Sequence, residues 1–153
     1  MLNRRAFMAS ATAATFMGSS AFSKQFEITR TDAEWRKLLT KAQYKVLREE
    51  GTERPGSSKL NAEKRDGLYH CAGCDLALYS SETKYESGTG WPSFWDALPN
   101  AIGTKPDRKL FTVRTEVHCR RCGSHIGHVF DDGPKPTGKR HCMNGIALTF
   151  RPA

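Results

Sequence analysis

The motif Cys71-Ala72-Gly73-Cys74 is followed, after a spacer of 44 residues, by a second C-x2-C pair, Cys119-Arg120-Arg121-Cys122. Each pair follows a predicted strand, and Gly73 and Gly123 allow the tight turns that bring the thiolates to one ion. A tetrahedral set of four thiolates favours zinc, which is structural in such a closed site. The sequence therefore predicts one zinc ion, bound by Cys71, Cys74, Cys119 and Cys122. Two disulfides or a redox C-x-x-C motif are the alternative interpretations of these pairs.

The composition is that of one globular domain. The chain has 153 residues, 38% of them hydrophobic and 10% aromatic, which is enough for a modest core and excludes disorder and collagen-like repeats. The formal net charge is +8, but the positive residues occur singly and in pairs, without the dense basic run of a nucleic-acid surface. We therefore expect no nucleic-acid partner.

The first 23 residues have the pattern of an export signal. The adjacent Arg4 and Arg5 precede a mild apolar stretch from Ala9 to Met17, which is followed by Gly18-Ser19-Ser20-Ala21-Phe22-Ser23. Paired arginines before an apolar region diluted by Ser and Thr are typical of the twin-arginine route. We expect residues 1–23 to be a twin-arginine-type signal peptide, and residues 24–153 to be an exported, periplasmic domain. The alternative is an uncleaved anchor, but the apolar stretch is shorter than the about 20 residues of a membrane span, so no stable membrane insertion is expected.

Two short helices are predicted at the start of this domain. Thr31-Asp32-Ala33-Glu34 and Thr40-Lys41-Ala42-Gln43 are capping boxes, and the second helix is expected to close at Gly51. The apolar face of the first helix is predicted to consist of Trp35, Leu38 and Leu39. Residues 52–66 are polar and rich in turn formers, which predicts a loop.

The rest of the chain is predicted to be β structure. Alternating patterns indicate strands at Leu68–His70, Leu76–Tyr79 and Leu110–Val117, and over residues 140–150. In the third strand, one face is predicted to carry Phe111, Val113 and Val117, and the other Arg114, Glu116 and His118. The sequence therefore predicts a mainly β fold, an antiparallel sheet or open barrel with short N-terminal helices.

The fifth cysteine, Cys142, is left over from the predicted zinc site. Arg140 and Asn144 flank it at strand spacing, so the three side chains are expected to share one face. A nearby cation favours the thiolate, which is the nucleophilic form of cysteine. Asn144 is suited to orient a substrate or a water molecule through hydrogen bonds. A lone cysteine is otherwise an inert packing residue, and this alternative remains open.

Two further segments carry candidate site residues. His125 and His128, with Asp131 and Asp132 soon after them, are suited to proton transfer because the thiolates already fill the metal site. Trp91 lies in a glycine-flanked loop that is able to hold a small apolar or thioether group against the indole ring. Structural histidines and simple core packing are the alternatives.

Taken together, the motifs resemble the B-type peptide-methionine (R)-S-oxide reductases over about residues 30–151. The motifs are YKVLREEGTERP (44–55), SGTGWPSF (87–94), RTEVHCRRCGSHIGHVFDDGP (114–134) and RHCMNGIALTF (140–150), together with both cysteine pairs. The resemblance implies antiparallel sheets in an open, partial barrel (Mss4-like), a structural zinc, and an oxidoreductase that reduces the R epimer of methionine sulfoxide, in proteins or free. It implies Cys142 as nucleophile, Trp91 as substrate-binding residue, and further catalytic-site residues at His125, His128, Asp132, Arg140 and Asn144.

Three positions depart from the pattern of that family. Thr89 stands where many members carry a recycling cysteine, so we expect a one-cysteine enzyme whose Cys142 sulfenic acid is reduced by an external, thioredoxin-like thiol. His141 replaces the usual Tyr or Phe, and Gly145 replaces a common small hydroxyl residue; we expect modest effects from both. After removal of the signal peptide, the protein is expected to be a monomer that repairs oxidative damage outside the cytoplasm. A non-catalytic zinc module and a basic nucleic-acid binder are the rival classes, and an assay on resolved sulfoxide epimers separates them.

Overall fold

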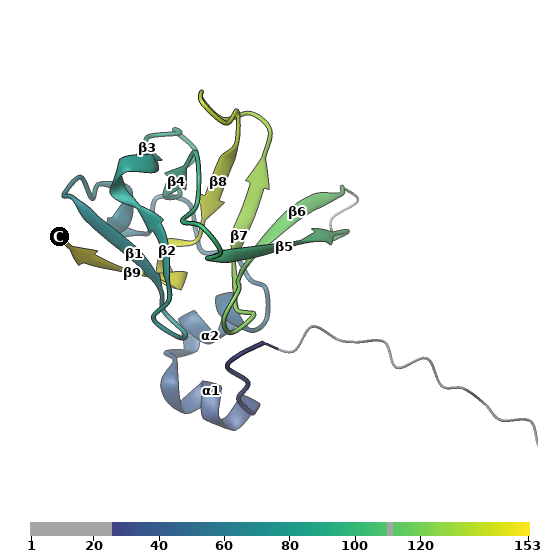
Figure 1. Cartoon of the computed structure of the whole chain (residues 1–153). Helices are drawn as coiled ribbons and strands as arrows, with labels where there is room; N and C mark the ends of the chain where they lie inside the picture. The colour runs from purple at the N-terminus through teal and green to yellow at the C-terminus, as the bar shows by residue number, and fades with distance from the viewer. Residues whose placement is uncertain (1–25, 110–111) are drawn as a thin grey trace, which may run out of the picture.

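The computed structural model describes residues 26–109 and 112–153 (Figure 1). The predicted signal peptide at residues 1–23 lies outside the described residues. Within the described ranges, none of the helices has the length and apolar character needed to cross a membrane.

Two short helices, α1 (Asp32–Leu38) and α2 (Lys41–Leu47), lie together at one end of the sheets (Figure 1). Both begin with the predicted capping boxes, in which a threonine side chain accepts a hydrogen bond from the backbone N–H three residues later. The second helix ends at Leu47, short of the predicted Gly51. Trp35 is buried, but Leu38 is 53% exposed, which corrects its predicted place on the buried face. The helix is so short that only the stripe from Trp35 to Leu39, four residues apart, faces the sheets.

The strands form two open antiparallel sheets, which confirms the predicted fold class. One sheet has the order β2-β1-β9, with β1 (Gly67–Cys71), β2 (Ala77–Ser80) and β9 (Leu148–Pro152). The other has the order β3-β4-β8-β7-β6-β5, with β3 (Lys84–Tyr85), β4 (Ser93–Phe94), β5 (Ile102–Asp107), β6 (Arg114–Cys119), β7 (His125–Phe130) and β8 (Arg140–Met143). Three 3₁₀ turns complete the described elements: η1 (Lys59–Asn61), η2 (Ser81–Thr83) and η3 (Gly145–Ala147).

Aromatic rings join the two sheets. Tyr79 of β2 stacks on Phe94 of β4 with ring centroids 4.4 Å apart, and Tyr69 of β1 meets the same ring edge-on at 4.9 Å. All three side chains are fully buried. Contacts of this kind add about 0.5–1.5 kcal/mol each beyond the buried area, so they help to fix one sheet against the other.

Leu110 and Phe111 of the predicted strand at 110–117 lie outside the described residues, and the part that is described is displaced toward the C-terminus. Strand β6 begins at Arg114, and Val113 lies before it, 73% exposed rather than on an apolar face. Glu116 is only 3% exposed, although it shares the polar face of the prediction. The reason is that β6 is an interior strand, where Lys105 from β5 approaches the Glu116 carboxylate to 3.1 Å.

The predicted strand at 140–150 is two strands in two different sheets. β8 ends at Met143, η3 turns the chain, and β9 continues in the sheet of β1. The Glu53 carboxylate accepts hydrogen bonds from the backbone N–H groups of Gly145 and Ile146, and so holds the turn in place. A Cβ atom at Gly145 would lie 1.9 Å from Ser58 Oγ and 2.4 Å from Ser58 Cβ. Glycine is therefore required here by the close approach of Ser58, and its position is in the turn rather than in a strand.

His141 points away from Cys142 along β8, because neighbouring residues of a strand face opposite sides. Its Nδ1 lies 3.2 Å from the Tyr79 hydroxyl, which itself lies 3.1 Å from Met143 Sδ. His141 is 7% exposed, and burial lowers the pKa of its imidazole, with Asp96 opposing the shift.

This burial predicts a pH-dependent stability. Because the pKa of His141 is lower in the folded chain, the unfolded chain binds the proton more readily, and stability present above about pH 6.5 is lost as pH falls. We expect the His141→Phe variant to show a shallower loss of unfolding free energy between pH 7 and 5, by at most about 1.4 kcal/mol per pH unit. Denaturant titrations at several pH values measure this, and equal slopes for both proteins would contradict it.

Candidate active site and zinc centre

The two cysteine pairs form the predicted zinc site. The four Sγ atoms lie within 4.8 Å of one another, with Cys71 Sγ 3.7 Å from Cys122 Sγ and Cys74 Sγ 3.5 Å from Cys119 Sγ. These separations are far longer than the about 2.05 Å of a disulfide, and all four cysteines are free. Four converging thiolates are the donor set that a structural zinc ion prefers.

The zinc site ties the two sheets and the helices together. One cysteine pair lies at the turn between β1 and β2, and the other at the turn between β6 and β7, so the ion joins one sheet to the other. Gly73 of the first turn packs so closely that an added Cβ would meet Leu47 at 3.2 Å and Trp35 at 3.4 Å. Ser124 Oγ lies 3.2 Å from Cys122 Sγ and orients that ligand.

Polar side chains from five adjacent strands lie in register across the larger sheet. Opposite residues on antiparallel strands point to the same face, and the pairs Lys105–Glu116, Glu116–His128, His128–Cys142 and Cys142–Ser93 are direct partners. We call this set the polar row: Lys105, Glu116, His128, Cys142 and Ser93.

A pocket of about 120 Å³ opens at the centre of the polar row. It brings together four of the residues singled out in the sequence, Trp91, His128, Cys142 and Asn144. The sequence had not marked the other lining residues, which are Thr52, Arg114, Gly127 and Phe130. Arg114, Gly127 and Phe130 lie within the 114–134 motif and Thr52 within the 44–55 motif, but nothing in the sequence distinguished these four residues from their neighbours.

Cys142 is half-buried beside Thr89. Burial raises the pKa of the Cys142 thiol, and it outweighs the opposing effects of the Thr89 hydroxyl, 3.8 Å from Sγ, and of the Arg140 charge. The Arg140 charge acts in the predicted direction, because it lowers the pKa of Cys142, but burial has the larger effect. A raised pKa favours the thiol, and a base that takes its proton would make Cys142 nucleophilic.

Arg140 is held at the rim of the site by Asp132. Its Nε and Nη2 donate to the two carboxylate oxygens of Asp132 at 2.8 and 2.9 Å, and its guanidinium lies 4.4 Å from the Phe130 ring centre. Asp132 is largely exposed. Neither residue lines the pocket itself.

His128 and His125 have different surroundings. His128 lines the pocket, and its Nε2 lies 2.8 Å from Asp107 Oδ2. His125 is 2% exposed, does not line the pocket, and has Nδ1 3.2 Å from Glu116 Oε1 without the alignment of a hydrogen bond. The two rings meet edge-on at 5.3 Å. His125 therefore contacts the His128 ring but does not line the pocket.

Asn144 and Trp91 both hold the backbone of Glu53. Asn144 Oδ1 accepts from the Glu53 N–H at 2.9 Å, while its Nδ2 donates to the Ile126 carbonyl at 3.0 Å. Trp91 Nε1 donates to the Glu53 carbonyl at 3.1 Å. These bonds fix the indole beside the pocket, and they leave Asn144 one side-chain N–H for a ligand.

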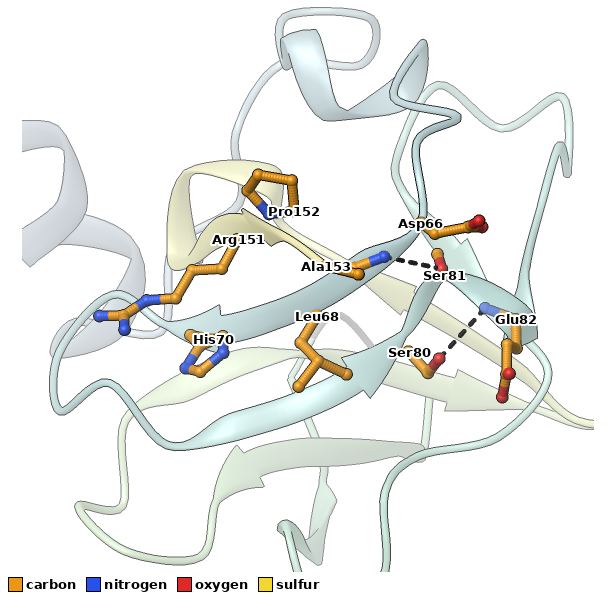
Figure 2. A pocket seen from close by; sticks show the side chains of 10 residues that line it. Asp66, Leu68, His70, Ser80, Ser81, Glu82, Arg151, Pro152 and Ala153 are labelled. Atoms are coloured by element: carbon orange, nitrogen blue, oxygen red, sulfur yellow. Dashed lines mark hydrogen bonds between the residues drawn. The ribbon is translucent and has the colours of Figure 1, made fainter.

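A larger hollow lies elsewhere, on the outer face of the sheet of β1, β2 and β9 (Figure 2). Its volume is about 580 Å³, and Leu68, His70, Ser80 and Arg151 project around it (Figure 2). None of the predicted site residues lines it. The larger of the two hollows is therefore not the one that contains the predicted site residues.

The zinc site of four cysteines joins two open antiparallel sheets, and the Cys142 thiol lies opposite His128. These features are typical of a thiol oxidoreductase with a structural zinc ion. The model of the SelR domain family matches residues 39–152. The chain is 52% identical over 128 residues to a protein of Methanosarcina barkeri named "Peptide methionine sulfoxide reductase MsrB", covering 83% of this chain and 90% of that one. Proteins of the same name from Methanosarcina mazei and Pseudomonas entomophila are each 50% identical over 127 residues, covering 82% of this chain and 91% and 97% of theirs. The chain belongs to the SelR family, the B-type peptide methionine sulfoxide reductases.

Proposed function

We propose that this protein reduces the R epimer of methionine sulfoxide to methionine with Cys142 as nucleophile. Membership of the B-type family makes it a peptide-methionine (R)-S-oxide reductase. The observation that carries the residue assignment is the placement of the Cys142 thiol directly opposite His128, in a pocket walled by Trp91.

The reaction requires a proton to move from sulfur to oxygen. His128 takes the Cys142 proton, the thiolate attacks the sulfoxide sulfur, and the imidazolium returns the proton to the sulfoxide oxygen. The protonated oxygen then moves to Cys142 Sγ, as its bond to the substrate sulfur and the S–S bond formed in the attack both break. Methionine and a Cys142 sulfenic acid remain, so the thiol is oxidised and the sulfoxide reduced, with atoms and electrons balanced.

Substrate orientation follows from the shape of the pocket. A volume of about 120 Å³ suits the methylsulfinyl end of the side chain, and the Trp91 ring offers an apolar contact for the methyl group. The two epimers exchange the positions of methyl and oxygen at sulfur. Only one of them places the methyl group on Trp91 and the oxygen near His128 at the same time.

Reduction of resolved sulfoxide epimers tests this function. With dithiothreitol as reductant, we expect turnover of peptide-bound R-sulfoxide and none of the S-sulfoxide. Activity on the S epimer alone would overturn the assignment, and inactivity on both would favour a non-catalytic zinc module.

We propose further that Cys142 works without a resolving cysteine. The other four cysteines form the zinc site, and Thr89 is the residue that lies 3.8 Å from Cys142 Sγ. An external thiol of the thioredoxin type would then reduce the sulfenic acid directly, with the enzyme as a monomer. Gel filtration and turnover with purified thioredoxin test these two points.

Mass spectrometry of substrate-oxidised protein distinguishes the recycling routes. We expect dimedone-trapped sulfenic acid at Cys142 in the native chain and no disulfide to Cys142. The Thr89→Cys variant is the matched control, because its added thiol would lie within reach of Cys142 and is expected to convert most of the sulfenic acid into a disulfide. A Cys142 disulfide in the native chain would contradict the one-cysteine route.

The proposed place of action is outside the cytoplasm, where the enzyme would repair oxidised methionine. Support comes from the Arg4-Arg5 pair and the apolar stretch after it. Periplasmic fractions of expressing cells should contain a chain that begins near residue 24. A full-length chain confined to the cytoplasm would contradict export.

A further inference from the structure

Asp107 carries a largely buried carboxylate that no sequence pattern predicted to be part of the site. It ends strand β5, and its side chain is 9% exposed. Its Oδ2 receives two groups at once, His128 Nε2 at 2.8 Å and Arg114 Nη2 at 2.7 Å. Asp107, His128 and Cys142 therefore form a chain of neighbours that leads from β5 across β7 to β8.

The carboxylate is ionised in this setting. Hydrogen bonding from His128, then the Lys109 backbone N–H and the Arg114 side chain, holds the pKa of Asp107 below its ordinary value. An ionised carboxylate only accepts hydrogen bonds. The proton in the contact of 2.8 Å consequently belongs to His128 Nε2, which fixes the tautomer of the neutral ring.

This tautomer decides which atom serves the pocket. With the proton on Nε2, Nδ1 carries the lone pair, and among the described residues Nδ1 has no hydrogen-bond partner. Other charged or titratable groups around the ring are Arg114 and Glu116 on β6, His125 on β7 and Cys142 on β8. Burial lowers the pKa of His128, while Asp107 opposes that shift.

We propose that Asp107 is the positioning residue of the reductase: it holds His128 as the Nε2–H tautomer, so that Nδ1 accepts the Cys142 proton and delivers it to the sulfoxide oxygen. When Nδ1 is protonated, the Asp107 carboxylate stabilises the imidazolium across the Nε2–H bond. Arg114 keeps Asp107 ionised and prevents it from taking the proton. The inference rests on the proposed role of His128 and adds the group that makes that role possible.

The arrangement follows the logic of an acid–histidine–nucleophile triad. In such triads the acid orients the imidazole and stabilises its cation, and it does not itself become protonated. The thiol here has a raised pKa and needs a base, which a free thiolate would not. The requirement for Asp107 therefore comes from the burial of Cys142.

A single-turnover assay isolates the step in question. Enzyme in excess over R-sulfoxide peptide reports formation of sulfenic acid and methionine without the recycling thiol. We expect Asp107→Asn to slow this step about 10- to 100-fold, a part of the 10²- to 10⁴-fold that a placed proton carrier contributes, with substrate affinity changed less than about twofold. The acidic limb of the rate profile is expected to move to lower pH, because His128 loses the anion that raises its pKa.

Asp66→Asn is the matched control. Asp66 is an exposed aspartate beside the larger hollow and outside the active-site pocket, and the same change of charge there is expected to leave the single-turnover rate and its pH profile as in the native enzyme. Zinc content and the unfolding temperature of all three proteins show whether the variants are folded.

Long-range ¹H–¹⁵N NMR spectra of the native enzyme test the tautomer without any variant. We expect His128 to carry its proton on Nε2 at neutral pH. A native Nδ1–H tautomer, or an unchanged rate in folded Asp107→Asn, would overturn the inference. If the native enzyme itself fails to reduce the R epimer, the proposed function fails instead, and the NMR result still decides the placement of the proton.

Discussion

Cys142→Ser is expected to lose sulfoxide reductase activity by about 10³-fold or more, because a serine hydroxyl is a far weaker nucleophile and cannot form a sulfenic acid. Serine has nearly the size of cysteine, and Cys142 is outside the zinc cluster, so the change removes the reacting atom and little else. Turnover of R-sulfoxide peptide with dithiothreitol measures the loss.

Zinc content and thermal unfolding are the controls for this variant. Both are expected to match the native chain, since the four metal ligands remain. Retention of native turnover in a folded, zinc-loaded Cys142→Ser protein would show that another group carries the reaction.

Cys119→Ser, unlike Cys142→Ser, is expected to lose zinc and stability. Cys119 is fully buried, and its Sγ belongs to the set that joins the two sheets through zinc. Loss of a structural metal belongs to the few single changes that cost on the order of 4 kcal/mol or more. For a chain of this size, this corresponds to a fall of about 10 °C or more in unfolding temperature.

The two serine variants control each other, because each removes one thiol. Metal analysis and differential scanning calorimetry of Cys119→Ser should show lost zinc and lower stability, whereas Cys142→Ser keeps both. A Cys119→Ser protein with full zinc and native stability would contradict the structural role of the site.

The features that the sequence predicted correctly are local or depend on spacing. Each capping box is complete within four residues, so Thr31 and Thr40 locate their helices without tertiary information. The cysteine pairs likewise predict a zinc site from their spacing alone, because few other functions need two C-x2-C motifs. The juxtaposition of Cys142 and His128 was expected only from the family resemblance, since the strand that carries His128 was not predicted.

The features that the sequence could not reveal depend on pairing between distant segments. Asp107 becomes part of the site only because β5 ends next to Arg114 and within reach of His128. The Glu116 side chain has the pattern of a solvent-exposed residue, and only its interior strand buries it. Strands β3, β4, β5 and β7 were not predicted, since they are very short or lack apolar–polar alternation.

The crowding between Gly145 and Ser58 has a consequence for the evolution of this family. A side chain at position 145 and one at position 58 compete for the same space, since even the first added carbon would overlap Ser58. Related sequences with a hydroxyl residue at 145 are therefore expected to carry glycine at 58, and those with glycine at 145 are free to keep a side chain there. Substitutions at these two positions, far apart in the chain, should be inherited as a pair rather than one at a time.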